Sequence, residues 1–250
     1  MFKAACASHT LATFLHQPCP SSMSLLAFHP RSLATLLCAS SCLALTACGG
    51  GDDNDTTTPA TTTKLAECFD VTPGNAYTMS DGDWILITQE AFEGGTRNAR
   101  VSLESQNGTR RVFADYWSRD ASSVRFWGDL EYQDDANNTV LAKTVSSAGQ
   151  TLSTSLQVGQ SSVMNYTDTR TEGGQTTTQA RQETWTFAGL STQTLGGKQF
   201  VDMCRIDITD ADGSATQWWA KGYGVVRYEI KNAQGTVVES GQLTAITAQL

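Results

Sequence analysis

The chain has 250 residues, with 17 Lys+Arg against 25 Asp+Glu, and its formal net charge is −8. An acidic balance of this size argues against nucleic acid or anionic lipid headgroups as partners. All three histidines, His9, His16 and His29, lie within the first 47 residues. The remainder therefore cannot use a Ser-His-Asp triad, a Cys-His pair or a histidine metal site.

The first 47 residues predict a secretory signal peptide. They contain no Asp or Glu, and Lys3 and Arg31 are their only fixed positive charges. The uncharged stretch Ser32–Gly51 is apolar and ends in small residues, as signal peptides do. It is too short and too rich in Ser and Thr for a membrane span, which needs about 20 mainly apolar residues. A leader starting at Met23 would have ordinary length, so our hypothesis is that residues 1–22 are not translated.

The apolar run ends in Leu45-Thr46-Ala47-Cys48, followed by Gly49. This motif resembles the lipobox of bacterial lipoproteins. The resemblance implies cleavage before Cys48, a lipid on its sulfur and N-acylation, typically with palmitate. Ordinary cleavage after Ala47 is the alternative, but it requires a small residue where Leu45 stands. The residue after the cysteine is Gly49 and not Asp. In this it resembles bacterial lipoproteins that are sorted to the outer membrane, and the resemblance implies the same location.

Residues 48–64 predict a lipidated cysteine and a flexible tether. Gly49–Lys64 contains Gly, Asp and Thr with one Pro and no large apolar side chain, so it cannot bury enough surface to order itself. A chain of this length typically spans about 20–24 Å. Without the leader the chain keeps 15 of its 17 basic and all 25 acidic residues, a net charge of −10. Its contact with the membrane is therefore expected through the acyl chains alone.

Residues 65–250 predict an all-β domain. Short runs rich in Val, Ile, Thr and aromatic residues alternate with polar residues and end at turn formers such as Asn107-Gly108 and Asp212-Gly213. No apolar stripe at helical spacing extends over three turns. The pattern predicts one antiparallel, strongly curled sheet, a barrel or half-barrel meander. The predicted runs are Trp84–Thr88, Arg100–Glu104, Arg111–Trp117, Ser123–Tyr132, Val140–Val145, Ser162–Thr169, Glu183–Phe187, Phe200–Thr209, Val225–Lys231 and Thr236–Thr247, the last with a candidate bulge at Gly241.

Two cysteines remain after the leader and Cys48 are set aside, Cys68 and Cys204. Exported proteins occupy an oxidising compartment, where an even pair is normally joined. We therefore expect a disulfide that closes a loop of more than 130 residues. On the chain-entropy account such a bond contributes up to about 5 kcal/mol.

No catalytic, cofactor-binding or metal-binding motif stands out. Asp207–Gly213 lacks the ligand spacing of a calcium loop and is expected to form a hairpin turn. The arginines between residues 97 and 125 are expected to form a solvated surface. Trp218, Trp219 and Tyr223 are the candidate contacts for a ligand or partner, because they lie in the densest aromatic region. One of the two adjacent tryptophans should enter the core and the other should face outward.

The order of residues in the C-terminal third resembles a known pattern. Leu195-Gly196-Gly197-Lys198-Gln199-Phe200-Val201-Asp202-Met203-Cys204 precedes Trp218-Trp219-Ala220-Lys221-Gly222-Tyr223-Gly224-Val225-Val226-Arg227-Tyr228-Glu229. This resembles the C-terminal part of bacterial periplasmic lipoproteins of unassigned activity, with Trp219, Tyr223 and Arg227 replacing their usual Tyr, Val and Lys. The resemblance implies a curved antiparallel sheet similar to lipoprotein-carrier folds, which hold acyl chains. It implies no catalytic activity.

Three functions remain open. The first is a non-enzymatic, lipid-anchored, periplasm-facing protein that binds an apolar ligand or an envelope partner, and is sorted to the outer membrane. The second is a structural or assembly subunit of the envelope without a small-molecule site. The third is a histidine-free hydrolase that uses acidic residues. A deep apolar cavity inside the sheet would favour the first over the second.

Overall fold

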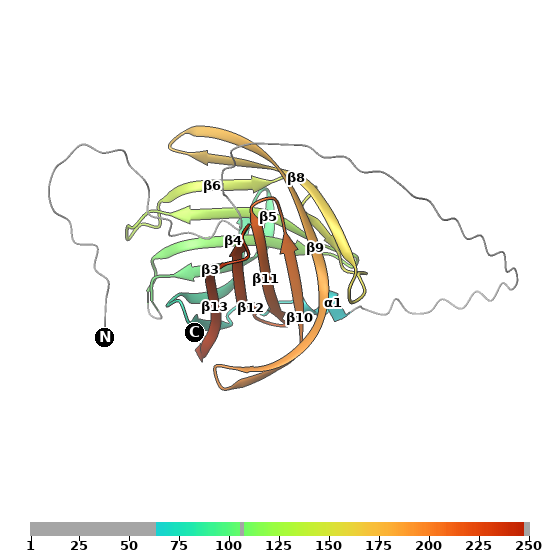
Figure 1. Ribbon diagram of the computed structural model, residues 1–250. Coiled ribbons are helices and arrows are strands. Elements are labelled where there is room, and N and C mark those ends of the chain that lie inside the picture. The colour runs from blue at the N-terminus through green and yellow to red at the C-terminus, as the bar shows by residue number, and fades with distance from the viewer. Residues whose placement is uncertain (1–63, 106–107, 248–250) are drawn as a thin grey trace, which may run out of the picture.

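A computed structural model describes residues 64–105 and 108–247. The predicted signal peptide, Met23, the lipidation site Cys48 and all of the tether except Lys64 lie outside these ranges. The described chain holds one short helix and thirteen strands (Figure 1). They are α1 (Lys64–Cys68), β1 (Ala76–Met79), β2 (Trp84–Phe92), β3 (Gly95–Leu103), β4 (Arg111–Arg119), β5 (Ser123–Tyr132), β6 (Val140–Ser146), β7 (Thr151–Ser153), β8 (Ser161–Glu172), β9 (Gln175–Leu195), β10 (Lys198–Thr209), β11 (Gly213–Ala220), β12 (Gly224–Asn232) and β13 (Val237–Thr247).

The strands form a closed antiparallel barrel. Neighbours in sequence pair around the ring, and β1 pairs with β13 to close it. Twelve strands make up the ring, and β7 is an extra strand paired to β5 beyond the point where β6 ends. In Figure 1 the strands β3–β6 run across the molecule while β10–β13 cross them on the other side. The prediction of a curled antiparallel meander is confirmed, as a full barrel.

Each of the ten predicted runs falls on a strand. The strands that the pattern did not predict are β1, β7 and β11, of which β1 and β7 have only four and three residues. The longest strand, β9, extends well beyond the predicted Glu183–Phe187, because Gln175–Ala180 form a polar hairpin arm with β8. That arm carries no apolar alternation from which a strand could be recognised.

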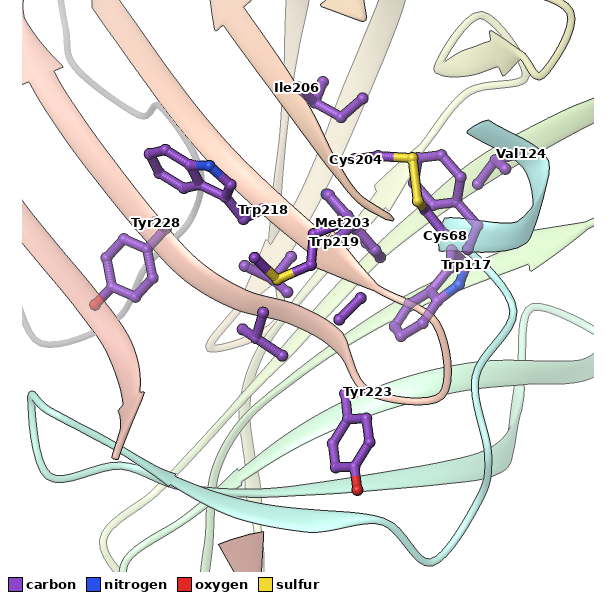
Figure 2. Close-up of a cluster of buried hydrophobic side chains, with 14 of the residues drawn as sticks. Cys68, Trp117, Val124, Met203, Cys204, Ile206, Trp218, Trp219, Tyr223 and Tyr228 are labelled. Carbon is purple, nitrogen blue, oxygen red and sulfur yellow. A yellow bond between two sulfur atoms is a disulfide. The ribbon is translucent and has the colours of Figure 1, made fainter. Parts of the chain in front are cut away.

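Alternating side chains point into the barrel and form its main core. Trp117, Trp219 and Phe69 meet there, with ring centroids 5.6 Å apart for Trp117–Trp219 and 4.6 Å apart for Phe69–Trp219 (Figure 2). Phe126 and Trp185 continue the cluster at 4.8 Å. Aromatic rings therefore fill this part of the interior.

The helix α1 closes one end of the barrel. Leu65 and Phe69 are fully buried against the main core. A disulfide joins Cys68 to Cys204 of β10, with the Cα atoms 6.0 Å apart, as the cysteine count predicts. The segment after α1 is fixed to the turn between β11 and β12, where the Gly222 amide donates to the Asp70 carbonyl at 2.7 Å. At five residues α1 is too short to cross a membrane, and no other helix occurs in the described ranges.

The expected bulge at Gly241 is wrong. Gly241 pairs regularly with Tyr228, and the irregularity between β1 and β13 lies beside Met79 instead. A Cβ atom at Gly241 would lie 2.6 Å from the Tyr228 ring and 2.8 Å from an Asp81 carboxylate oxygen. The glycine is there because the Tyr228 ring lies directly over its backbone.

Candidate functional site

The three predicted contact residues do not form one site. Trp219 enters the main core, where its indole N–H donates to Gln217 at 2.9 Å. Trp218 faces the outside of the barrel, with the guanidinium of Arg227 4.4 Å from its ring centre. Adjacent tryptophans on opposite faces are what strand geometry predicts. Tyr223 follows Gly222 in the β11–β12 turn, at the end of the barrel closed by α1.

Tyr223 packs on Phe200, with ring centroids 5.3 Å apart, and accepts a hydrogen bond from Lys198 Nζ at 3.0 Å. It is 9% exposed, as is Trp218. Each therefore offers a ligand only the edge of a packed ring. The contacts account for both residues as packing elements of the barrel.

Two hollows on the described surface are lined mainly by polar residues. The larger, of about 480 Å³, lies at β8 and β9 and is lined by Ser147, Asn165, Tyr166, Thr167, Ala180, Arg181 and Gln182. The smaller, of about 170 Å³, lies along β12 and β13 around Arg227 and Ser240. Neither is the deep apolar cavity that an enclosed acyl chain would need.

A row of mainly charged side chains lies in another part of the barrel interior. Arg100, Asp115, Asp129, Thr144 and Arg170 lie directly opposite one another across β3, β4, β5, β6 and β8. The expectation that the arginines of residues 97–125 are solvated is thus wrong for Arg100, whose side chain is 12% exposed and lies 3.7 Å from Asp115. Two ion pairs hold this row inside the barrel: Arg100 with Asp115, and Arg170 with Glu131 of β5.

Burial changes the acidity of this row. Desolvation, reinforced by the charge of Glu131, raises the pKa of Asp129 to about 7. One Asp129 carboxylate oxygen is buried and has no hydrogen-bond partner among the described residues. Desolvation also raises the pKa of Asp115, despite the opposing charge of Arg100. Glu131 itself accepts two hydrogen bonds from Arg170, at 2.6 and 2.9 Å.

The hairpin turn predicted at Asp207–Gly213 connects β10 and β11. The Asp210 carboxylate accepts hydrogen bonds from the backbone N–H groups of Asp212, at 2.8 Å, and Gly213, at 2.9 Å. Within 64–105 and 108–247, no three His, Cys, Asp or Glu side chains converge as metal ligands would.

A second cluster occupies the outer face of the barrel over β1–β6. Its members alternate with the core residues along the strands and therefore point outward. The rings of Phe92 and Tyr116 are stacked there with centroids 4.2 Å apart. We call this the outer aromatic cluster: Ala76, Trp84, Phe92, Ala99, Val101, Leu103, Ala114 and Tyr116, with Leu86, Trp127, Leu130, Tyr132 and Val145 packed against it.

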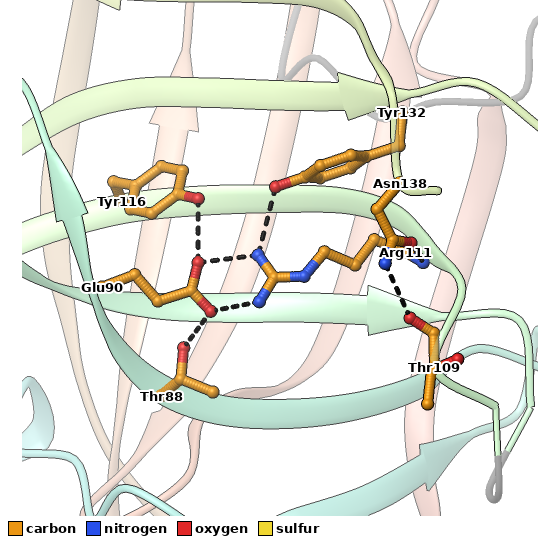
Figure 3. Close-up of polar contacts among 7 residues, drawn as sticks. All are labelled: Thr88, Glu90, Thr109, Arg111, Tyr116, Tyr132 and Asn138. Carbon is orange, nitrogen blue, oxygen red and sulfur yellow. Dashed lines mark hydrogen bonds and ion pairs between the residues drawn. The ribbon is translucent and has the colours of Figure 1, made fainter. Parts of the chain in front are cut away.

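An ion pair is set into this cluster (Figure 3). Arg111 donates to both oxygens of Glu90, at 2.6 and 2.7 Å, and to the hydroxyl of Tyr132 at 3.1 Å. Thr88 and Tyr116 donate their hydroxyls to the same carboxylate, at 2.9 and 3.2 Å. Burial acts to raise the pKa of Glu90, but the hydrogen bonds from Arg111 and Thr88 outweigh it and hold the pKa below its usual value.

Two further arginines flank Trp127 of this cluster. The guanidinium carbons of Arg97 and Arg125 lie 3.6 and 3.5 Å from the centre of its ring. Both can be this close only from opposite faces of the indole. The indole N–H donates to Ser118 at 2.8 Å, which fixes the ring between them. We call Arg97, Trp127 and Arg125 the arginine clamp.

No protein family and no curated protein sequence matches this chain. Two solved structures are similar to it, each at 12% sequence identity and over 72% of this chain and 98% of the other. One, from Bacteroides fragilis, is named as an exported protein with a YmcC-like fold and gives a TM-score of 0.40. The other, from Parabacteroides distasonis, is named as a lipoprotein and gives a TM-score of 0.35. Function has to be inferred from the residues of this chain.

Proposed function

We propose that this chain is a non-enzymatic lipoprotein of the bacterial envelope that acts by binding at the outer surface of its barrel. The lipobox at Leu45–Cys48 supports anchoring through acyl chains on Cys48. Gly49 after the cysteine supports sorting to the outer membrane, with the barrel facing the periplasm.

The observation that carries the proposal is the filled interior. Packed rings, among them Trp117, Trp219 and Phe69, occupy the end that the helix α1 closes. Another part of the interior holds the charged row from Arg100 to Arg170, which would oppose an apolar chain. A partner is therefore bound from outside, which favours an envelope partner over an enclosed acyl chain.

The interior carboxylates support the non-enzymatic part of the proposal. Glu183 accepts hydrogen bonds from Tyr166 and from the Trp185 indole, both at 2.7 Å. Asp168 accepts one from Ser146 at 2.6 Å and faces Arg181 at 3.5 Å. Each of these carboxylates is held by neighbouring side chains, which accounts for its burial as a structural group.

A fluorescent fatty acid, cis-parinaric acid, tests the filled interior directly. We expect no saturable binding to the purified mature protein, because the main core leaves no space for an acyl chain. Phe126→Ala provides the matched control: it removes a ring from the same core, so a gain of binding would show that the assay detects interior space. Saturable binding at one site of the unaltered protein would contradict the proposal.

Anchoring is tested separately by cell fractionation. The unaltered protein is expected in outer-membrane vesicles, and a variant in which the cleavable signal peptide of a soluble periplasmic protein replaces residues 1–48 is expected in the soluble periplasmic fraction. Identical fractionation of the two would remove the basis for the proposed location.

A further inference from the structure

The two arginines of the clamp have no carboxylate oxygen within 4.0 Å among the described residues. Seven of the ten arginines in the described ranges lie within 4.0 Å of a carboxylate oxygen. The exceptions in that part of the chain are Arg97, Arg125 and Arg227. The mature chain has ten more acidic than basic residues, so counter-ions are abundant. Two of these three unpaired guanidiniums flank the same indole.

Strand register explains why Arg97 is left unpaired. Its direct cross-strand neighbour on β2 is Glu90, the position from which a counter-ion would normally come. The Glu90 carboxylate instead binds Arg111 through both oxygens. Arg97 makes only long hydrogen bonds, to the carbonyls of Thr96 at 3.4 Å and Glu93 at 3.5 Å.

Arg125 has no acidic neighbour in register. It lies opposite Ser118 on β4 and Thr151 on β7. The Nε atoms of both clamp arginines are buried without a hydrogen-bond partner in the described chain. Burial, together with the nearby charge of Arg97, lowers the pKa of Arg125. Two cations thus face each other across one ring, and no carboxylate oxygen of the described residues lies within 4.0 Å of either.

We propose that the arginine clamp is a binding site for a phosphate group, held between the outer edges of the Arg97 and Arg125 guanidiniums at the rim of Trp127. This proposal deepens the proposed function, on which it rests, because it names a ligand chemistry for the outer surface.

Phosphate fits the clamp better than a carboxylate does. A phosphate monoester has up to two negative charges and three free acceptor oxygens, which can neutralise and hydrogen-bond two guanidiniums at once. Planar guanidiniums bind such oxygens bidentately, and each is already fixed by stacking on the indole. A carboxylate has one charge and two oxygens, so it would satisfy one of the two arginines.

Arginine side-chain NMR on the mature protein tests the site. The Nε–H signals of Arg97 and Arg125 are followed during titration with inorganic phosphate, and with acetate, at constant ionic strength. We expect saturable shifts of these two signals with phosphate, at a Kd of about 1 mM or tighter, and weaker ones with acetate. The proposal would be overturned if the Arg97 and Arg125 signals did not move with phosphate, or if they moved no more than the signal of Arg227.

Variants separate the clamp from general surface charge. Arg97→Gln and Arg125→Gln should each weaken phosphate binding at least about tenfold, a loss of about 1.4 kcal/mol. Arg97→Lys should retain part of the binding, since it keeps the charge but loses the planar fork. Arg227→Gln is the matched control, because Arg227 also stacks on an outward-facing tryptophan, but the second arginine there, Arg205, is farther from the ring, at 5.9 Å, and is paired with Asp207. An equal loss in Arg227→Gln would contradict a defined site.

Vesicles identify the source of the phosphate. Phosphatidylcholine vesicles with and without phosphatidic acid are compared in flotation with the acyl-free protein that lacks residues 1–48. Flotation that depends on phosphatidic acid and on Arg97 indicates a lipid headgroup, whereas shifts with inorganic phosphate alone indicate a soluble phosphate. If neither inorganic phosphate nor phosphatidic acid binds, the clamp is rejected as a phosphate site but the proposed function stands. The proposed function fails if parinaric acid binds in the interior.

Discussion

At the scale of single residues, the Glu90–Arg111 pair shows how the barrel places charge among aromatic rings. The two side chains are 18% and 29% exposed, and their bidentate contact neutralises both within the outer aromatic cluster. When one member of the pair is removed, the remaining charge is half-buried and has lost its counter-ion.

Glu90→Gln should therefore lower the free energy of unfolding by about 1–2 kcal/mol, allowing for the partial exposure of the pair. Urea unfolding measures the change. Lys221→Gln, which removes an exposed pair with Glu67, is the control and should shift it by less than about 0.5 kcal/mol. Equal effects would show that the network contributes no more than a surface ion pair.

Asp129 gives the fold a defined pH dependence. Its pKa is about 7 in the folded protein against an ordinary value of 3.8, so the folded state binds more protons than the unfolded chain between these values. Stability associated with the protonated carboxyl is complete below about pH 4 and is lost as pH rises to about 7.

Asp129→Asn removes this titration and keeps the shape of the protonated side chain. Relative to the unaltered protein, the variant should gain stability as pH rises from about 4 to about 7, by up to about 4 kcal/mol. Urea unfolding at several pH values measures the difference. Parallel stability curves for the two proteins would show that Asp129 is ionised at no cost inside the barrel.

At the scale of elements, the turn between β11 and β12 depends on backbone freedom. Gly222 and Gly224 have φ of +89° and +74°, and a Cβ atom at Gly224 would meet nothing closer than 3.8 Å. Strain, and not a clash, would therefore penalise a side chain at Gly224.

Gly224→Val should lower the thermal midpoint, with a stability loss of about 1–3 kcal/mol, and leave acylation of Cys48 unchanged. Gly224→Asn should lose less, because asparagine tolerates positive φ. Differential scanning calorimetry of both variants makes the comparison. An unchanged midpoint for the valine variant would contradict the strain.

The disulfide is the covalent link between α1 and the barrel, across 136 residues of sequence. A Cys68→Ala, Cys204→Ala double variant should lose about 2–5 kcal/mol of stability. Its urea midpoint should be insensitive to reductant, whereas that of the unaltered protein should fall to a similar value. A reductant-insensitive unaltered protein would show that the bond does not form.

Strands were predictable from sequence wherever one side chain in two is apolar, as in Ser123–Tyr132, which matches β5. The short β1 and β7, and the Thr-rich arm of β8 and β9, carry too little of that signal. Closure of the barrel was not predictable, because β1 and β13 pair across almost the whole domain. A half-barrel would have the same local pattern.

The outer-face groups were missed for a different reason. Which side chains meet across strands depends on register, and a shift of one residue moves every side chain to the other face. Trp127 also lies at an irregularity in the β4–β5 pairing. A usable signal was present nevertheless, since Arg125 and Trp127 are two residues apart on one predicted strand and so share a face.

At the scale of the whole molecule, the barrel has a closed end and a filled interior. The helix α1, the disulfide and the Gly222 turn meet at one end, where the chain enters from the predicted tether. Aromatic packing and the charged row occupy the inside between them. The outer face over β2–β6 carries the arginine clamp, where we propose that a ligand binds.

Native mass spectrometry of the detergent-purified mature protein tests this account most directly, because one spectrum reports acylation, the disulfide and any bound ligand. The account predicts an acylated chain beginning at Cys48, two hydrogens lighter than its reduced form, with no lipid bound in the barrel. A stoichiometric apolar ligand that survives removal of detergent would contradict it.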